Sequence, residues 1–245
     1  MKKTAGCAPL LKRTGHWLRG AGQALRTWIL EVVYPENALC RACGAVTREG
    51  CLCDRCRNSL RHDHFLYHWD VRDLDGVRAY SLRPHEGIPR RLVIRLKHQA
   101  EACIAGELAQ LVHPVPAFLA FAPGTTVTWV PMPRRRRRER CIDHGKVLAE
   151  AVARELNLPC RPLLLRRDDN ARTQASLGKA ARERNLAHAF APAGPIDTPV
   201  LLVDDVLTTG TTARRCIAAL REGGAKEITV LTVTKAMGFG SPVSP

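Results

Sequence analysis

The sequence predicts an α/β protein, in which a largely parallel β-sheet is flanked by helices and preceded by a small cysteine-rich module. Segments with strand and helix patterns alternate along most of the 245 residues. One buried-strand pattern, in residues 200–212, runs into two acids and a Thr/Gly loop, as at the ligand-binding edge of such a sheet. Two Cys-x-x-Cys pairs near the N-terminus indicate the separate module.

The composition is that of a globular protein. Hydrophobic side chains make up 45% of the residues, enough for one α/β domain and a small appendage, and aromatics make up only 5%, which disfavours ring stacking as the main mode of ligand binding. No run of about 18 apolar residues occurs, so we expect no transmembrane segment. Lys2 and Lys3 are not followed by the apolar stretch of a signal peptide, so we expect a cytoplasmic protein.

The chain is strongly basic, with a formal net charge of +15 and a pI near 9.9. One interpretation is a solvated basic surface. The other is a polyanionic partner, because lysines and arginines that neutralise phosphates give salt-dependent affinity for nucleic acid. The charge alone does not choose between them.

The N-terminal part is expected to form a helix ahead of the cysteines. Apolar residues recur at helical spacing through 18–33, and this helix would pack on the cysteine module or on the main domain. A helix on a membrane surface is the alternative. We expect residues 1–17 and 237–245 to be disordered, residues 18–62 to form the helix and the cysteine module, and residues 63–236 to form the α/β domain.

The cysteine module has the spacing of a zinc ribbon. Two Cys-x-x-Cys pairs can present four thiolates tetrahedrally to a structural Zn²⁺, whose binding would supply the folding free energy of this polar segment. Disulfides are the alternative, and a cytoplasmic location disfavours them. Cys51 could replace Cys53 as a ligand. The predicted ligands are Cys40, Cys43, Cys53 and Cys56. The other cysteines, Cys7, Cys103, Cys141, Cys160 and Cys216, are expected to be apolar packing residues or surface thiols.

The middle of the chain alternates strands and helices. Apolar periodicity predicts strands at 77–81, 127–131 and 163–166, and helices at 88–96, 102–112 and 145–156. This order favours a parallel sheet.

An arginine-rich run, residues 133–140, follows one predicted strand. It would lie at the sheet edge where ligands collect, and guanidinium groups suit pyrophosphate or nucleic-acid phosphates. A solvated basic loop is the alternative. Residues 172–177 and 181–186 could form a ligand-covering segment or a surface helix.

The sequence Val-Leu-Leu-Val-Asp-Asp-Val-Leu-Thr-Thr-Gly-Thr-Thr, residues 200–212, has the parts of a sugar-phosphate site. A strand at 200–203 leads to Asp204 and Asp205, whose carboxylates can accept hydrogen bonds from vicinal hydroxyls. The loop at 208–212 opens a helix at 213–221 and offers N–H and hydroxyl groups to a phosphate. The alternative to a sugar-phosphate site is a strand, turn and helix in which the two acids lie on the surface and cap the helix. A P-loop is not indicated, because its sequence pattern does not occur. The motif resembles the 5-phosphoribosyl-1-pyrophosphate (PRPP) motif of type I phosphoribosyltransferases.

Taken in order, the motifs resemble the ComF family of zinc-ribbon, type I phosphoribosyltransferase-like proteins. The resemblance covers most of the chain and rests on residues 40–56, 96–98, 130–140, 172–177, 183–186 and 203–212. It implies a phosphoribosyltransferase-like domain at 63–236, and a role in DNA uptake and natural transformation through single-stranded DNA. The chain departs from the family pattern Arg-Gly-Phe-Asn-Gln at 140–144, where it has Arg-Cys-Ile-Asp-His.

The resemblance also implies roles for individual residues. Asp204 and Asp205 would hold the ribose hydroxyls, and Mg²⁺ would arrive with the pyrophosphate. The 5-phosphate would be wrapped by Thr208, Thr209, Gly210, Thr211 and Thr212. Candidate contacts to pyrophosphate or nucleic acid are Lys97, Arg134, Arg140 and Arg184.

Three functions stay open at this stage, and all of them include PRPP binding. They are a DNA-uptake protein, a Mg²⁺-dependent phosphoribosyltransferase with an unknown acceptor, and a PRPP-sensing regulator. Phosphoribosyltransferases of purine salvage carry an aspartate, which acts as a base toward the purine, where this chain has Thr208. A hydroxyl at its ordinary pKa cannot act as that base, so the acceptor is not expected to be a purine.

Overall fold

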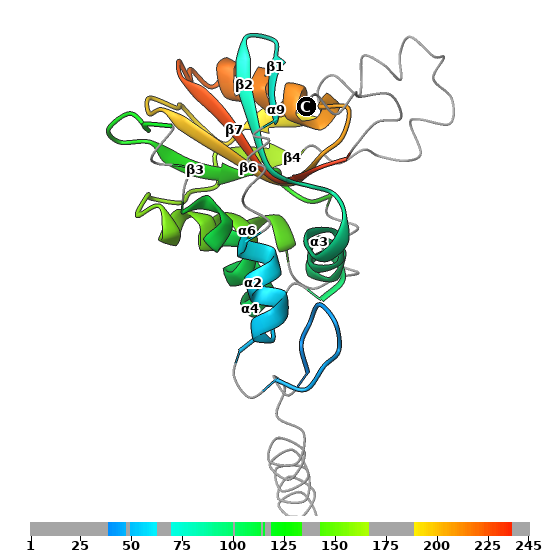
Figure 1. Cartoon of the computed structure of the whole chain (residues 1–245). Coiled ribbons are helices and arrows are strands. Elements are labelled where there is room, and N and C mark those ends of the chain that lie inside the picture. Colours follow the sequence, from blue (N-terminus) through cyan, green and yellow to red (C-terminus); the bar gives the residue numbers. More distant parts are fainter. Residues whose placement is uncertain are drawn as a thin grey trace, which may run out of the picture.

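The computed structural model describes residues 39–47, 50–62, 70–99, 101–113, 115, 119–133, 143–166 and 189–236. Its centre is a five-stranded sheet made of β1 (Asp70–Leu74), β2 (Val77–Pro84), β3 (Thr126–Trp129), β6 (Val200–Leu207) and β7 (Ile228–Lys235). The strand order is β1-β2-β7-β6-β3 (Figure 1). β1 pairs antiparallel with β2, and the other neighbouring strands run parallel. The predicted α/β fold with a largely parallel sheet is confirmed.

Helices cover both faces of this sheet (Figure 1). One face carries α3 (Gly87–Gln99), α4 (Ala102–Ala109) with its 3-10 turn η3 (Gln110–Val112), and α6 (His144–Glu155). The other face carries α9 (Thr211–Glu222) and a small antiparallel sheet of β4 (Leu164–Arg166) and β5 (Phe190–Pro192). Because strand side chains alternate between faces, Leu201 and Val203 join the core under α3, α4 and α6, whereas Val200 and Leu202 join the core under α9.

The largest difference from the predicted elements is the length of β6. The strand was expected to end at Val203, because acids are depleted from strand interiors. It continues to Leu207, since its parallel ladder with β7 goes on through Asp204, which is registered with Thr232. Both acids therefore lie inside a central strand, and α9 begins at Thr211, two residues before its expected start.

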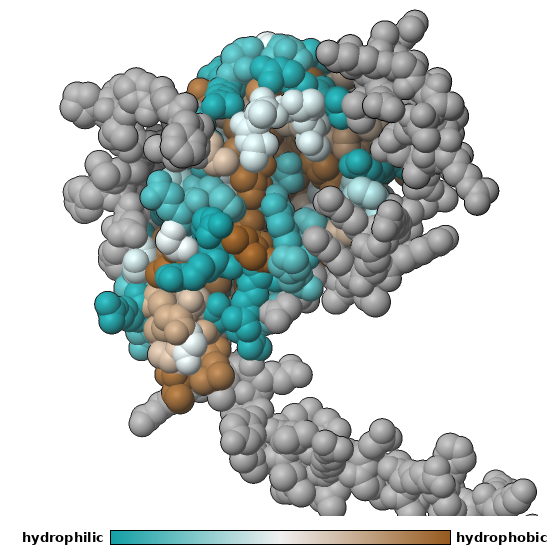
Figure 2. Space-filling model, turned by 90° about the vertical axis from the view of Figure 1, so that its right-hand side faces the viewer, coloured by the Kyte–Doolittle hydropathy of each residue, from teal (hydrophilic) through white to brown (hydrophobic). Residues whose placement is uncertain are grey.

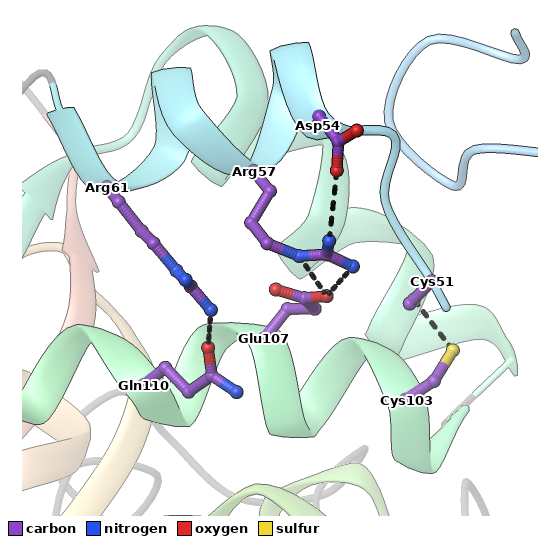
Figure 3. A network of polar contacts seen from close by, with 7 residues as sticks. All are labelled: Cys51, Asp54, Arg57, Arg61, Cys103, Glu107 and Gln110. Atoms are coloured by element: carbon purple, nitrogen blue, oxygen red, sulfur yellow. Dashed lines mark hydrogen bonds and ion pairs between the residues drawn. The ribbon is translucent and has the colours of Figure 1, made fainter. Parts of the chain in front are cut away.

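The cysteine module docks on the main domain through α2 (Asp54–His62). Figure 3 shows side chains of α2 pointing at α4. Arg57 donates through Nε and Nη2 to Glu107 Oε1, at 3.2 and 3.1 Å, and Arg61 donates to Gln110. Glu107 is buried, so the pairing with Arg57 compensates the cost of removing its carboxylate from water.

Apolar side chains gather at the lower end of the described surface in Figure 2, the end at which the cysteine-containing loop lies in Figure 1. Leu39 and Val46, which pair as an antiparallel bridge in this loop, are 51% and 79% exposed. In the part of the chain that the structure describes, no helix is both long and apolar enough to cross a membrane. The expected helix at 18–33 lies outside that part, as do the segments at 1–17 and 237–245 that were expected to be disordered.

Candidate functional site

The two adjacent acids of β6 point to opposite faces of the sheet. Asp205 follows the parity of Leu201 and Val203, so its carboxylate faces α3 and α6. Asp204 faces the α9 side, where its charge acts on the buried thiol of Cys216. The pair therefore offers one carboxylate to each layer at the carboxyl end of the parallel strands.

Side chains from two helices lie against the Asp205 carboxylate. Lys97 Nζ, from α3, lies 3.1 Å from Oδ1, and His144 Nε2, from the first turn of α6, lies 3.2 Å from Oδ2. The burial of Asp205 would raise its pKa, but the contacts from His144 and Lys97 outweigh this effect and hold the pKa below its ordinary value. Asp205 is therefore an ionised, buried carboxylate at neutral pH.

The pKa of Asp204 shifts in the opposite direction. Burial, followed by repulsion from Asp205, raises the pKa of Asp204 to about 7. The backbone N–H of Asp205 donates to Asp204 Oδ1 at 2.9 Å and offsets only part of this effect. The site thus has one carboxyl that is ionised and one that takes up a proton near neutral pH, a difference typical of functional sites.

A third strand end brings another polar pair to this edge. His85 follows β2 in the chain, and its Nδ1 lies 2.8 Å from the hydroxyl of Thr234 on β7. The same hydroxyl donates to the Asp205 backbone carbonyl at 3.2 Å. Burial, followed by the charges of Lys97 and Arg90, lowers the pKa of His85. The carboxyl ends of β2, β7 and β6 are therefore linked by side chains beside the acids.

The loop after β6 turns directly into α9. Gly210 caps the helix with a φ of 80°, a left-handed conformation that favours glycine. The hydroxyls of Thr209 and Thr211 lie 2.9 Å apart across this turn. A loop of this form, opening a helix N-terminus, offers N–H groups and hydroxyls to an anion.

The β1–β2 hairpin lies against this loop. A Cβ on Gly210 would stand 2.8 Å from Leu74 Cδ2, so the loop and the end of β1 are in close contact. Arg72 Nη1 donates to the Thr208 carbonyl at 3.0 Å, and Arg214 Nη1 donates to the Thr209 carbonyl at 3.2 Å. Neither arginine was among the predicted site residues. Nothing in the sequence near Arg72 indicates a ligand, and Arg214 lies just beyond the motif at residues 200–212.

The four predicted zinc ligands come together at the N-terminal module. The ligand atoms of Cys40, Cys43, Cys53 and Cys56 all lie within 4.8 Å of one another. Tetrahedral Zn–S bonds would place sulfurs about 3.8 Å apart, and the Cys43 and Cys53 sulfurs are 3.7 Å apart. The four thiols therefore fit a structural zinc ion.

The turn around Cys40 also favours a thiolate. Burial would raise the pKa of Cys40, but backbone N–H groups of Cys53, Cys43 and Ala42 lower it to about 6. The tight turn expected at Gly44 is present, with a φ of 77° and a hydrogen bond from its N–H to the Cys40 carbonyl.

Cys51 does not join this cluster. Its sulfur lies 2.7 Å from that of Cys103, at the start of α4 (Figure 3). The structure thus brings Cys53, and not Cys51, to the four-sulfur cluster. Cys216 lies on the buried face of α9, as expected of a packing residue, whereas Cys103 lies in a polar contact that the sequence did not indicate.

The described structure gathers only some of the predicted site residues. Asp204, Asp205, the loop 208–212 and Lys97 lie at one edge of the sheet, and the four-cysteine cluster is separate from them. Three of the candidate phosphate contacts lie outside the described residues, namely Arg134, Arg140 and Arg184. His144 was noted in the sequence as a departure from a family pattern, but its contact with Asp205 was missed.

This edge of the sheet lies in a region that matches a known protein domain. A family model described as a phosphoribosyl transferase domain matches residues 141–238, which contain β6, its acids and the loop before α9. With the parallel sheet, this match defines a phosphoribosyltransferase-like protein. A Bacillus subtilis glutamine PRPP amidotransferase structure is 18% identical, with a TM-score of 0.40 over 57% of this chain and 30% of that one.

Two relatives narrow the class of phosphoribosyltransferase-like protein to which this chain is similar. Competence protein F of Haemophilus influenzae is 26% identical over 227 residues, which cover 82% of this chain and 92% of that protein. DNA utilization protein YhgH of Escherichia coli is 26% identical over 200 residues, which cover 78% and 88% of the two chains. Together with the phosphoribosyl transferase domain, these relatives support a ComF family protein.

Proposed function

We propose that this protein binds PRPP at the edge formed by β6 and α9 and acts in DNA uptake. The observation that carries the PRPP proposal is the acid pair inside β6, followed by the left-handed turn at Gly210 that opens α9. The 5-phosphate would lie on the loop 208–212, with the ribose hydroxyls on Asp204 and Asp205. Mg²⁺ would enter with the pyrophosphate group, as hard cations bound through phosphate oxygens do.

The charges beside the acids support this proposal. A sugar that carries a pyrophosphate brings several negative charges, and Lys97 lies at Asp205, where it can oppose them. We propose Lys97 for the pyrophosphate side of the site. Arg134, Arg140 and Arg184 stay proposals for the same anion or for nucleic acid.

A structural zinc ion is part of the proposal. Cys40, Cys43, Cys53 and Cys56 would hold it, and the bound metal would supply the folding free energy of the module. Since all four positions are filled by sulfur, the metal would have no open position for substrate.

The proposed DNA role rests on the relatives and on charge. Both relatives are named for competence or DNA utilization, and the net charge of +15 suits a polyanionic partner. We propose single-stranded DNA as that partner. Its affinity should fall steeply with salt, because several phosphates would be neutralised. Binding that is absent, or that does not change between 50 and 200 mM salt, would count against this partner.

The PRPP proposal is tested by ligand-induced thermal stabilisation. The wild type should be stabilised by PRPP with Mg²⁺, and the double variant Asp204→Asn, Asp205→Asn should lose the shift while remaining folded. Asp197→Asn, which removes an exposed carboxylate near the start of β6, is the matched control and should keep the shift. An unchanged shift in the double variant would contradict the assigned site.

An active phosphoribosyltransferase is the second candidate. It is favoured by Asp204, because a carboxyl with a pKa of about 7 beside the ribose can exchange a proton at neutral pH. Release of pyrophosphate from PRPP in the presence of a panel of non-purine acceptors would support it. Binding of PRPP without release under any condition would favour a PRPP-sensing regulator.

A further inference from the structure

The β1–β2 hairpin reaches the loop before α9 from outside the part of the chain that the phosphoribosyl transferase model matches, residues 141–238. Arg72, on β1, donates to the Thr208 carbonyl at 3.0 Å. Arg214, in the first turn of α9, donates to the Thr209 carbonyl at 3.2 Å. Two successive carbonyls of the loop are thus each held by a guanidinium group.

The turn of the hairpin keeps Arg214 in place. Arg214 Nε donates to Asp75 Oδ1 at 3.1 Å, and Arg221 Nη2 donates to the Asp75 carbonyl at 3.0 Å. Asp75 has a φ of 57°, and the next N–H, that of Gly76, is bound by Asp73 Oδ1 at 2.9 Å. Because the turn is closed on itself and attached to two points of α9, it can orient the Arg214 side chain.

These contacts determine which way the loop presents its N–H groups. In a trans peptide the carbonyl and the following N–H lie in one plane and point in opposite directions, and no peptide of the described chain is cis. With the Thr208 and Thr209 carbonyls aimed at the arginines, the N–H groups of Thr209 and Gly210 point to the opposite side. Among the residues that the structure describes, neither of these N–H groups has an acceptor.

We propose that Arg72 and Arg214 are positioning residues for a phosphate monoester, and that the β1–β2 hairpin is part of the phosphate site. They hold two loop carbonyls so that the N–H groups of Thr209 and Gly210 converge on the ester oxygens. Leu74 packs closely on Gly210 in this loop, since a Cβ there would meet Leu74 Cδ2 at 2.8 Å. This inference rests on the proposed function, because the monoester is the 5-phosphate of PRPP.

The two arginines act through the loop carbonyls. A lysine at position 72 can also donate to the Thr208 carbonyl, whereas an alanine cannot. The substitutions Arg72→Lys and Arg72→Ala therefore separate the loss of the carbonyl contact from an incidental change at the surface. Arg78, exposed on β2 of the same hairpin, provides the control Arg78→Ala.

The first measurement is calorimetric affinity for ribose 5-phosphate and for PRPP with Mg²⁺, in the full chain. Arg72→Ala should weaken the binding of both ligands by about 10-fold, as expected for the loss of one charge-assisted hydrogen bond. Arg72→Lys should recover most of the affinity, and Arg78→Ala should match the wild type. Equal affinities for the wild type and Arg72→Ala, with both folded, would overturn the proposal.

The second measurement does not depend on PRPP binding. Amide hydrogen exchange at Arg214, whose N–H donates to the Gly210 carbonyl of the loop at 2.9 Å, should become faster in Arg72→Ala without ligand, and the peptides of β7 should keep the rate of the wild type. If wild-type protein binds neither ligand but this local change appears, the proposed function is wrong and the orienting role of the hairpin stands. If exchange at Arg214 is unchanged, the hairpin does not hold the loop and the inference fails.

Discussion

Lys97 Nζ lies 3.1 Å from Asp205 Oδ1, and the carboxylate is buried. The pair joins α3 to the central strand β6 at the point where the acid motif lies. His144 approaches the other oxygen of Asp205 from α6. Two helices of one layer are thereby attached to a single carboxylate of the proposed PRPP site.

Loss of the Lys97 contact should destabilise the protein. Lys97→Met would leave the Asp205 carboxylate buried with only part of its compensation, and we expect a loss of about 1–3 kcal/mol in the free energy of unfolding. The lysine side chain is 33% exposed, so solvent screening keeps the loss below that of a fully buried pair. The measurement is equilibrium unfolding in urea.

Lys146→Met is the matched control for that experiment. Lys146 Nζ lies 3.6 Å from Glu150 on the surface of α6, where both side chains are about half exposed. Its removal should change the stability by less than about 0.5 kcal/mol. Equal losses in the two variants would mean that the contact with Asp205 contributes nothing beyond a surface pair.

The raised pKa of Asp204 predicts a pH-dependent cost of folding. The folded state keeps this carboxyl protonated up to a pKa of about 7, whereas the unfolded chain ionises it near the ordinary aspartate pKa of 3.8. Stability should therefore decrease as the pH rises from about 4 to 7, and the full cost should be present above pH 7. Asp204→Asn should remove this decrease and gain on the order of 2 kcal/mol at pH 8.

The pH effect is measured by urea unfolding at pH 5, 6, 7 and 8. Asparagine at 204 still offers Oδ1 to the N–H of Asp205, so the variant keeps that hydrogen bond. The exposed residue Asp197 provides the comparison, and Asp197→Asn should keep the profile of the wild type. A constant difference between Asp204→Asn and the wild type at all four pH values would contradict the assignment.

The cysteine geometry predicts different metal contents for neighbouring variants. Cys53→Ala should lose the bound zinc and the folded structure of the module, because three thiolates remain. Cys51→Ala should retain about one zinc per chain, since Cys51 faces Cys103. Elemental analysis of the purified variants measures their zinc content. Loss of zinc in Cys51→Ala alone would reverse the ligand assignment.

Arg57 should be important for docking the cysteine module. In Arg57→Ala the buried Glu107 carboxylate would lose its fork of hydrogen bonds, and we expect a loss of about 2 kcal/mol. Arg55→Ala, at an exposed position of α2, should change stability by less than about 0.5 kcal/mol. Thermal and urea unfolding of the two variants give the comparison. Equal stabilities would show that the α2–α4 contact is maintained by apolar packing alone.

Most elements could be predicted because their pattern is local. The helix predicted at 145–156 is α6, and the strand predicted at 77–81 is the first part of β2. The antiparallel β4–β5 pair and the extension of β6 to Leu207 depend on partners distant in the chain. Local propensity therefore placed the end of β6 four residues too early, since acids are poor strand formers without a neighbouring ladder.

By itself, the sequence determined the fold class, the resemblance to the ComF family and the positions of the two motifs. Strand–helix alternation, the acid–Thr/Gly motif and the paired cysteines are local patterns, and each carries its own physical reason. Only the tertiary structure decided which side chains meet. Contacts such as those of Asp205 with Lys97 and His144, and of Arg72 with the Thr208 carbonyl, join segments dozens of residues apart. Sheet order and helix packing create these contacts, and no local periodicity encodes them.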